Sequence, residues 1–315
     1  LIVRKSGHGL FSASPLSSSA KKLPMRVLIA LNDYASAAKA QLLEKLRGRL
    51  LEGGHSVHVH LFDYQDRILR SVPSHSYDML ILMPSSQALL PSDMLRLKAI
   101  NIPILFLDLA STEGIVSNCI QSDNAQGGAM AAMHLARLGH QKVAVFACGT
   151  ERQAIKARIS GFVRQCALLN IEIINIYDCE IKAGELPAEK MFTLAELAMK
   201  KGKGNFSAAF CPSDTAAPGL LHALCNARIK VPDEISVIGF DGISDSAFYN
   251  PPLTTIAHDI DAFVDKTLSF IEACSLQNGA CQDFKFMIHP KLIERGSTSK
   301  VAALRQSLAV NAPAE

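Results

Sequence analysis

Long apolar runs are missing from this sequence of 315 residues, and so is a strong excess of charge. No stretch approaches the roughly 20 apolar residues that a membrane span needs. The formal net charge of +3 is too small to indicate that this segment binds nucleic acid. Charged residues make up 19% and hydrophobic residues 49% of the chain, so global disorder is excluded and a large buried core is expected.

The loops and nucleophile motifs of common enzymes are also lacking. No Gly-x-Gly-x-x-Gly follows a predicted strand, no phosphate loop with Gly-Lys-Ser/Thr occurs, and no Gly-x-Ser-x-Gly elbow is present. The histidines cluster only at His55, His58 and His60. His58 and His60 share a strand face and could form a metal pair, but no carboxylate or cysteine completes a site, which favours a solvated strand edge. We therefore expect a binding protein without catalytic residues, cofactor or metal.

Cysteine pairs with the C-x-x-C spacing do not occur. The eight cysteines are scattered, and they are Cys119, Cys148, Cys166, Cys179, Cys211, Cys225, Cys274 and Cys281. Several lie in apolar runs, which favours buried free thiols in a reducing cytosol over a disulfide scaffold.

No apolar segment follows Arg4 and Lys5, so a secretory signal is absent or was removed before this numbering. A first residue other than Met indicates a fragment or a processed form, and we expect a cytoplasmic location.

Alternating strands and helices are what the sequence does contain. Before them, residues 1–11 predict either a β-hairpin around residues 6–9 or a disordered tail, and residues 12–22 predict a flexible linker. The first series has strands near 26–31, 57–61, 77–83 and 103–107, with helices near 37–50 and 91–99. The second series has strands near 142–147, 172–177, 208–211 and 235–240, with helices near 127–138, 153–170, 187–201 and 214–226; a helix near 261–274 and a strand near 284–288 follow. Such βα series predict two doubly wound parallel sheets, each in a lobe of about a hundred residues, with a cleft between them.

The stretch from 231 to 256 combines a buried strand with a charged end. The apolar residues near 235–240 suit a strand covered on both faces, and Asp241 follows at its carboxyl end, where open α/β sheets bind ligands. The segment Asn250-Pro251-Pro252 then forms a stiff extended spacer before another strand. This order predicts a chain that crosses between two lobes.

Five segments carry a resemblance to a known family, and they are 123–140, 158–162, 210–214, 231–256 and 289–297. They contain Asp-Asn-Ala-Gln-Gly-Gly, Arg-Ile-Ser-Gly-Phe, Phe-Cys-Pro-Ser-Asp, Val-Pro-Asp-Glu-Ile-Ser-Val-Ile-Gly-Phe-Asp with Asn-Pro-Pro-Leu-Thr-Thr-Ile, and His-Pro-Lys-Leu-Ile-Glu-Arg-Gly-Ser. Together they closely resemble the effector-binding domain of the lactose/galactose-repressor (LacI/GalR) family. The resemblance implies the type I periplasmic-binding-protein-like α/β fold, with two doubly wound parallel-sheet lobes and a three-segment hinge.

The resemblance also implies domain limits. It assigns residues 25–122 and 257–280 to the N-terminal lobe and residues 123–256 and 281–298 to the C-terminal lobe. Residues 1–11 resemble the last wing of a winged helix of the gluconate-repressor (GntR) family, with Leu10 where a small residue is usual. Residues 1–24 are therefore expected to be the remnant of a wing and a linker, and residues 299–315 a tail.

Ligand contacts follow from the resemblance position by position. Asp241 matches an aspartate that accepts hydrogen bonds from ligand hydroxyls or amines, and Arg158 matches a ligand-binding arginine with a planar fork of donors. Asp108 matches a cleft aspartate, Ser85 a ligand-contacting loop, and Arg152 the further arginine of purine-binding members. A buried structural ion pair is the alternative for Asp241 and Arg158.

Three further positions are less specific. Asn32 and Asp33 lie at the tip of the first strand of the core and are predicted either as ligand contacts or as helix caps. Ser213 stands where sugar-binding members have asparagine, which argues against a lactose-like ligand. Asp214 after it is predicted to be a helix N-cap.

The implied function is effector sensing and dimerisation in a bacterial transcriptional regulator. A small molecule, a sugar or sugar derivative above all, would bind between the lobes of a homodimer and modulate DNA binding through a winged-helix domain largely missing from this chain. A periplasmic solute receptor for a transporter is the alternative, although the cysteines and the missing signal count against it. An enzyme on the same scaffold is a third reading, for which no motif speaks.

Overall fold

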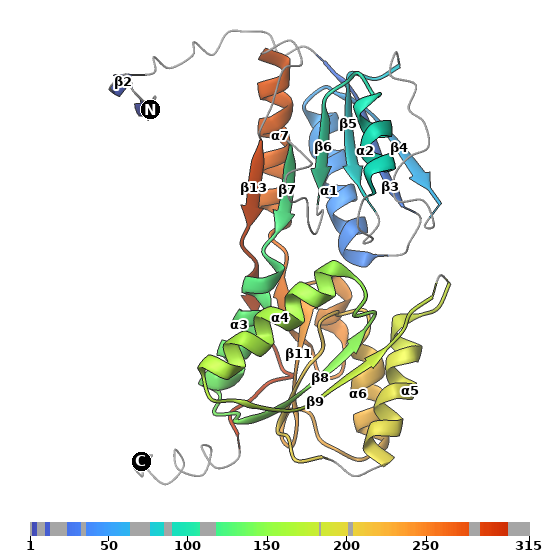
Figure 1. Ribbon diagram of the computed structural model, residues 1–315. Coiled ribbons are helices and arrows are strands. Elements are labelled where there is room, and N and C mark those ends of the chain that lie inside the picture. Colours follow the sequence, from blue (N-terminus) through green and yellow to red (C-terminus); the bar gives the residue numbers. More distant parts are fainter. Residues whose placement is uncertain are drawn as a thin grey trace.

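The protein folds into two α/β lobes that are joined along one side (Figure 1). The computed structural model describes residues 2–4, 10–12, 24–32, 36–63, 76–84, 90–107, 118–182, 184–200, 204–276 and 284–301. Each lobe contains a six-stranded sheet. Among the described residues, no helix is long and apolar enough to cross a membrane.

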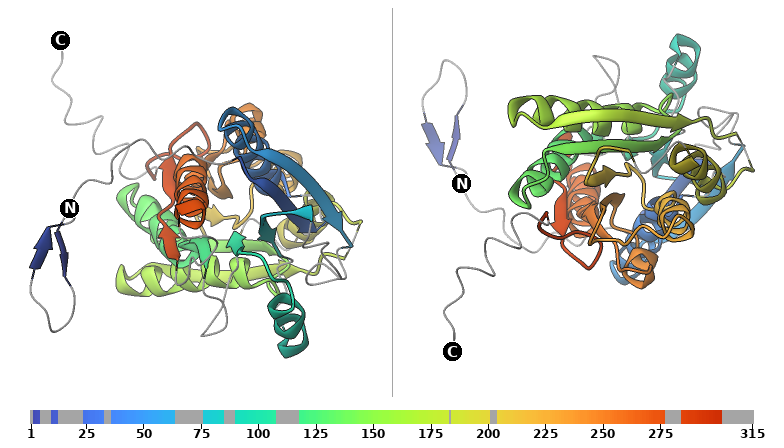
Figure 2. Two further views of the ribbon diagram at one scale, coloured as in Figure 1. Left: turned by 90° about the horizontal axis from the view of Figure 1, so that it is seen from above. Right: turned by 90° about the horizontal axis from the view of Figure 1, so that it is seen from below.

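The first lobe has a fully parallel sheet of order β13-β7-β6-β5-β3-β4. Its strands are β3 (Arg26–Asn32), β4 (Ser56–Phe62), β5 (Met79–Met83), β6 (Ile104–Leu107), β7 (Cys119–Ser122) and β13 (Lys285–Ile288). Every residue of β5 is buried, because helices cover both faces of the sheet. Helices α1 (Ala37–Glu52) and α7 (Ile260–Leu276) pack on one face and α2 (Pro91–Lys98) on the other (Figure 2).

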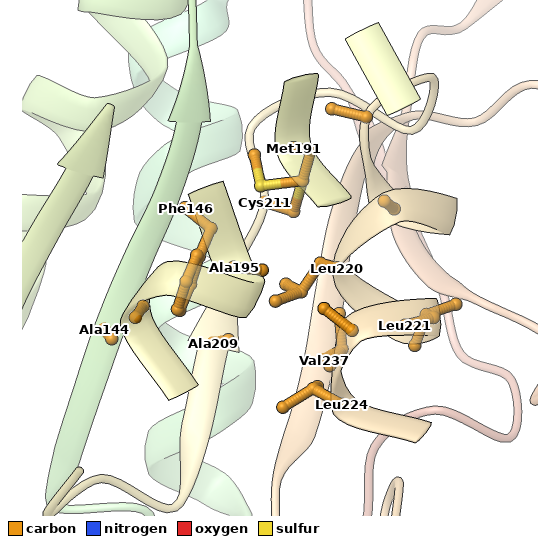
Figure 3. Close-up of a cluster of buried hydrophobic side chains, with 14 of the residues drawn as sticks. Ala144, Phe146, Met191, Ala195, Ala209, Cys211, Leu220, Leu221, Leu224 and Val237 are labelled. Carbon is orange, nitrogen blue, oxygen red and sulfur yellow. The ribbon is translucent and has the colours of Figure 1, made fainter. Parts of the chain in front are cut away.

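The second lobe has a sheet of order β14-β12-β11-β10-β8-β9, in which only the β12–β14 pair is antiparallel. Its strands are β8 (Lys142–Cys148), β9 (Glu172–Cys179), β10 (Ala208–Phe210), β11 (Ser236–Asp241), β12 (Thr254–Ala257) and β14 (Lys291–Ile293). Helices α3 (Asn124–Arg137) and α4 (Gln153–Leu168) cover one face. Helices α5 (Pro187–Lys200) and α6 (Ala217–Asn226) cover the other, where Met191, Leu220 and Leu224 pack with Phe146 over the sheet (Figure 3). The predicted fold class is confirmed.

Two glycines let α3 and α4 touch backbone to backbone. A Cβ atom at Gly128 would lie 1.9 Å from the carbonyl oxygen of Arg158, and one at Gly161 would lie 1.9 Å from that of Ala125. Neither position can hold a side chain without moving the helices apart. This contact fixes the helix that carries Arg158.

The chain crosses between the lobes three times, after β7, after β12 and after β13. Hydrogen bonds and an ion pair tie these crossings together. Ser122 Oγ lies 2.8 Å from His258 Nδ1, and the amide of Asp123 donates to the carbonyl of Ile288 at 2.9 Å. Lys291 Nζ lies 2.5 Å from Asp259 Oδ2. These contacts define the three-segment hinge.

One predicted lobe assignment is wrong. The sequence placed 281–298 in the C-terminal lobe, but β13 pairs in parallel with β7 and completes the sheet of the first lobe. After α7 the chain therefore adds β13 to the sheet that α7 covers, before it returns to the second lobe to form β14. Of the described part of 281–298, only the segment from β14 onward belongs to the second lobe.

The amino-terminal hairpin is present. Strands β1 (Ile2–Arg4) and β2 (Leu10–Ser12) pair antiparallel, with Val3 opposite Phe11. The residues that connect them, and most of the predicted linker and tail, lie outside the described residues.

Candidate functional site

A cavity of about 60 Å³ lies between the two lobes. The first lobe contributes Lys39 and apolar side chains of α1, β5 and α7, among them Leu42, Met83 and Phe263. The second lobe contributes Arg158, Asp241 and His258. Asp241 enters the cavity from the carboxyl end of β11, the sheet edge at which open α/β sheets bind ligands.

Asp241 reaches this position through an unusual backbone conformation. Its φ is +126°, and that of Gly242 is +71°. A non-glycine residue with such a φ is strained, and strain of this kind is retained where the surrounding structure enforces it.

Asp214 enforces the turn. Its buried carboxylate accepts the backbone N–H groups of Gly242 at 2.8 Å and Ile243 at 3.2 Å, and the hydroxyl of Thr255 at 2.8 Å. Burial and then the neighbouring Asp241 charge raise the pKa of Asp214 to about 7, although these hydrogen bonds oppose the rise. The predicted N-cap role of Asp214 is wrong, because α6 has Ala216 as its N-cap residue and the side chain turns instead to the loop after β11.

The buried guanidinium of Arg158 organises the cleft side of the second lobe. Nη1 donates to Asp241 Oδ1 and to the carbonyl of Pro212, both at 2.8 Å, while Nε donates to Asn124 Oδ1 at 2.8 Å. Its Cζ atom lies 3.9 Å from the centre of the Phe240 ring, so a cation–π contact adds to the hydrogen bonds. These contacts hold the planar guanidinium of Arg158 in a single orientation.

Asp241 is ionised in this setting. Burial raises the pKa of the Asp241 carboxyl, but the charge of Arg158 and the contact with His258 outweigh it and hold the pKa below its ordinary value. Its second oxygen accepts from Ser213 Oγ at 3.1 Å. Asp241 and Arg158 therefore form the buried ion pair that was the alternative to ligand contact, and Ser213 donates to it; the ligand contacts predicted for these three residues stay predictions.

His258 joins this charge cluster to the hinge. Its Nε2 lies 3.3 Å from Arg158 Nη2 and 3.5 Å from Asp241 Oδ1, while Nδ1 faces Ser122 Oγ at 2.8 Å. The Nε2 side of the ring therefore faces the charge cluster, and the Nδ1 side faces the first crossing segment. The imidazole thus contacts two of the three crossing segments and the cavity at once.

Lys39 faces this cluster from the first lobe. Its Nζ donates to the carbonyl of Pro84 at 2.8 Å and lies 3.5 Å from Asn32 Oδ1. Asn32 is therefore a buried neighbour of Lys39 and not the cap of α1, whose N-cap is Ser36. The cavity has one cation from each lobe and a carboxylate from the second.

Not every predicted contact lies here. Arg152 precedes α4 and has its Nε 3.5 Å from Glu151 Oε1, and it is not among the residues that line the cavity. Asp33, Ser85 and Asp108 lie outside the described residues, so their predicted roles stay predictions.

Sequence reasoning missed His258, Lys39 and Phe240. His258 follows the resembling segment 231–256 by two residues, so its place after a strand at the cleft was the available signal. Lys39 carried none, because it lies in an amphipathic helix beside other basic residues. Phe240 was read as a core residue, and it is one, with its ring face turned to Arg158.

The histidines of β4 form no metal site with other described residues, among which no group of three potential ligands is close enough to hold an ion. His58 Nδ1 lies 3.5 Å from the hydroxyl of Tyr77, and β4 is an exposed edge strand.

Fold and cavity together define a two-lobed α/β domain, with a charged cavity at the carboxyl edge of one sheet and a hinge of three segments beside it. A family model described as a periplasmic binding protein-like domain matches residues 132–298, more than half of the chain. The chain belongs to this family.

Curated relatives are repressors by name. The chain is 31% identical over 200 residues to the HTH-type transcriptional repressor PurR of Actinobacillus pleuropneumoniae serotype 3 (strain JL03), across 62% of this chain and 57% of the relative. It is 27% identical over 241 residues to PurR of Vibrio vulnificus (strain CMCP6), across 76% and 70%. The chain thus spans less than two thirds of the first of these relatives. Their names do not support the expected link to the GntR family.

Solved structures share the fold. A dimeric Lac repressor with an 11-residue C-terminal deletion superposes with a TM-score of 0.72 at 23% identity, over 87% of this chain and 99% of that one. A LacI family transcriptional regulator from Enterococcus faecium with bound ribose gives a TM-score of 0.72 at 20% identity, over the same shares of the two chains. At these identities the likeness establishes the two-lobed fold.

Proposed function

We propose that this chain is the effector-sensing part of a bacterial transcriptional regulator of the LacI/GalR kind. The observation that carries the proposal is the buried cluster of Arg158, Asp241 and His258, which faces Lys39 of the other lobe across the cavity and touches the hinge. The names of the relatives, repressors in both cases, support it. The proposed role is binding and not catalysis.

The ligand we propose is a sugar or a sugar derivative. Asp241 is ionised, and a carboxylate with about four lone-pair sites still has room for a ligand hydroxyl or amine. Nε and Nη1 of Arg158 donate to Asn124, Pro212 and Asp241, and Nη2 lies toward His258, so we propose that the Nη2 end of the guanidinium donates to the ligand. Apolar walls from Leu42, Met83 and Phe263 suit the less polar face of a sugar ring. Lys39 and Arg158, one cation from each lobe, suit a carboxylate or phosphate substituent on the sugar.

Ligand binding would act by shifting the balance between open and closed lobes. A ligand that contacts Lys39 on one lobe and Asp241 on the other binds the closed form better, and only such differential binding moves the equilibrium. Allosteric coupling free energies between two sites are typically about 1–3 kcal/mol. His258 contacts both the cavity and the hinge, so it is the residue through which closure would be sensed.

The partners follow from the same proposal. We propose a cytoplasmic homodimer that reads DNA through a domain outside this chain. The β1–β2 hairpin is compatible with the wing of a winged helix, and this remains our proposal for residues 1–11. Asp33, Ser85, Asp108 and Arg152 are proposed as further ligand contacts that would join the cluster on closure.

A thermal-shift screen of sugars, sugar acids, sugar phosphates and purines tests the site. We expect at least one sugar-class compound to raise the unfolding midpoint, and Asp241→Ala, Arg158→Ala and Lys39→Met to abolish the shift. Arg164→Ala is the matched control, since Arg164 lies on the exposed face of the same helix as Arg158. Circular dichroism checks that each variant is folded. Unchanged ligand binding in both Asp241→Ala and Arg158→Ala would sink the assignment.

A further inference from the structure

Two thiols meet at the edge of the second sheet, apart from the charge cluster. Cys148 ends β8 and Cys179 ends β9, and these two residues are direct partners in the parallel register of the two strands. Their Sγ atoms lie 2.8 Å apart, and both cysteines are free. Residues paired across neighbouring strands have the separation that a disulfide spans.

The two thiols differ in access. Cys148 is buried, and its Sγ also lies 3.8 Å from the carbonyl of Pro187. Cys179 is half-buried, so a small molecule in solvent can reach it. Cys211, which directly follows the neighbouring strand β10, is fully buried and lies among the apolar side chains under α5 and α6 (Figure 3). Cys179 is therefore the more accessible residue of the pair.

The pKa values of the two thiols are also shifted in opposite directions. The hydrogen bond with Cys148 lowers the pKa of Cys179, and Lys190 of α5 adds to this, against burial and the charges of Asp178 and Glu185. The same hydrogen bond, followed by burial, raises the pKa of Cys148. The more exposed thiol is thus the better nucleophile, because the thiolate is the reactive form.

We propose that Cys148 and Cys179 form a reversible dithiol–disulfide site for low-molecular-weight disulfides, with Cys179 as the attacking thiol and Cys148 as the resolving thiol. A metal site is the alternative for two adjacent cysteines, but no third potential ligand lies close to them among the described residues.

The chemistry balances as thiol–disulfide exchange. The thiolate of Cys179 attacks one sulfur of a disulfide such as oxidised glutathione, whose S–S bond breaks to release one thiolate and leave a mixed disulfide on Cys179. The released thiolate takes a proton from Cys148. Cys148 Sγ then attacks Cys179 Sγ, and the second small thiolate leaves with the proton that Cys179 had given up. The protein loses two hydrogens and two electrons, and one small disulfide becomes two thiols.

A disulfide between Cys148 and Cys179 would affect the part of the lobe that faces the cavity. Cys148 directly precedes the turn 149–152 that begins α4, the helix that carries Arg158, and the amide of Gly149 donates to the carbonyl of Cys179 at 2.8 Å. A covalent bond between the two strand ends would therefore fix the start of α4.

Peptide mapping after exchange tests the site. Reduced protein is equilibrated with oxidised glutathione, remaining thiols are alkylated, and the digest is analysed by mass spectrometry. We expect a Cys148–Cys179 cross-linked peptide that dithiothreitol removes. Cys148→Ser should instead accumulate glutathione on Cys179, because the resolving thiol is gone, whereas Cys179→Ser should leave Cys148 unmodified.

Cys225→Ser is the matched control, since Cys225 is an exposed cysteine of the same lobe and its loss should leave the cross-link unchanged. Modification of Cys225 in the wild-type protein shows that the oxidant has acted. Absence of the 148–179 cross-link under those conditions overturns the proposal, and so does glutathione on Cys148 in folded Cys179→Ser protein.

Discussion

At the scale of single residues, the site contains two aspartates whose pKa values are shifted in opposite directions. Asp241 is stabilised as a carboxylate by Arg158. Burial and the negative charge of Asp241 raise the pKa of the neighbouring Asp214 and so favour its neutral form. Asp214 nevertheless anchors the strained turn that points Asp241 into the cleft. A negative charge on both groups is the state that the fold disfavours.

Asp214→Asn tests this opposition through its pH dependence. The pKa of Asp214 is raised to about 7 in the folded protein, above the ordinary value of an aspartate, so the folded state binds the proton more tightly than the unfolded state. The stabilising contribution of this proton is present in acid and is lost as pH rises toward 7. We expect the free energy of unfolding of wild type, relative to the asparagine variant, to fall by about 1–4 kcal/mol from pH 4 to pH 8.

Urea denaturation at a series of pH values measures that difference, in which the titration of other groups cancels to first order. Thr255 can turn its hydroxyl to accept from the asparagine N–H, so the variant can keep its hydrogen bonds. A difference that rises with pH would show that Asp214 is an ordinary ionised anchor.

Arg158→Ala should also cost stability directly. The change leaves the buried Asp241 carboxylate without its main partner, and breaking a buried pair on one side costs about 3–5 kcal/mol. Chemical denaturation measures it, with Arg164→Ala, on the exposed face of α4, expected within about 0.5 kcal/mol of wild type. Equal losses in both variants would contradict a buried pair at this position.

At the scale of elements, the crossing of α3 and α4 sets where Arg158 stands. Gly161→Ala places a methyl group on the carbonyl of Ala125, and overpacking at a backbone contact should cost about 2 kcal/mol or more. Gly48→Ala is the matched control: Gly48 lies within α1 with open space around its Cβ position, and alanine should stabilise that helix by about 0.5–1 kcal/mol. Thermal and urea unfolding compare the two, and a stabilised Gly161→Ala variant would refute the contact.

The elements themselves were largely readable from the sequence. Buried parallel strands such as β5 and β11 are continuous apolar runs, and α1 ends at the glycine pair that the sequence marked. The site was half readable: Asp241 and Arg158 follow from strand position and resemblance. Lys39 did not, because its helix shows only amphipathic spacing until tertiary packing turns one side chain to the cleft. The assignment of β13 to a lobe was also wrong, because the sequence of a short strand does not determine which sheet edge it pairs with.

At the scale of the whole molecule, the two lobes touch across the cleft as well as through the hinge. Gln41 Nε2 of α1 donates to Ser244 Oγ of the second lobe at 2.5 Å. Gln41→Ala removes this contact, so the open form should gain population and effector affinity should fall by up to about fivefold. Small-angle scattering of the free protein and titration of the screened effector measure the two effects.

Glu44→Ala, an exposed position on the same helix, is the control for that variant and should change neither quantity. A radius of gyration and an affinity that both match wild type in Gln41→Ala would show that the interlobe contact does not bias closure.

The late strands β13 and β14 carry a consequence for synthesis. Each is the edge strand of a different sheet, β13 beside β7 and β14 beside β12, and both come from the last part of the described chain. A nascent chain that has emerged from the ribosome only as far as α7 therefore exposes the edges of β7 and β12, which β13 and β14 later cover, and unpaired edges of this kind invite wrong pairing. The sheet of the first lobe is complete only once β13 has emerged and that of the second only once β14 has followed, so the cleft between the lobes takes shape after α7 has been made.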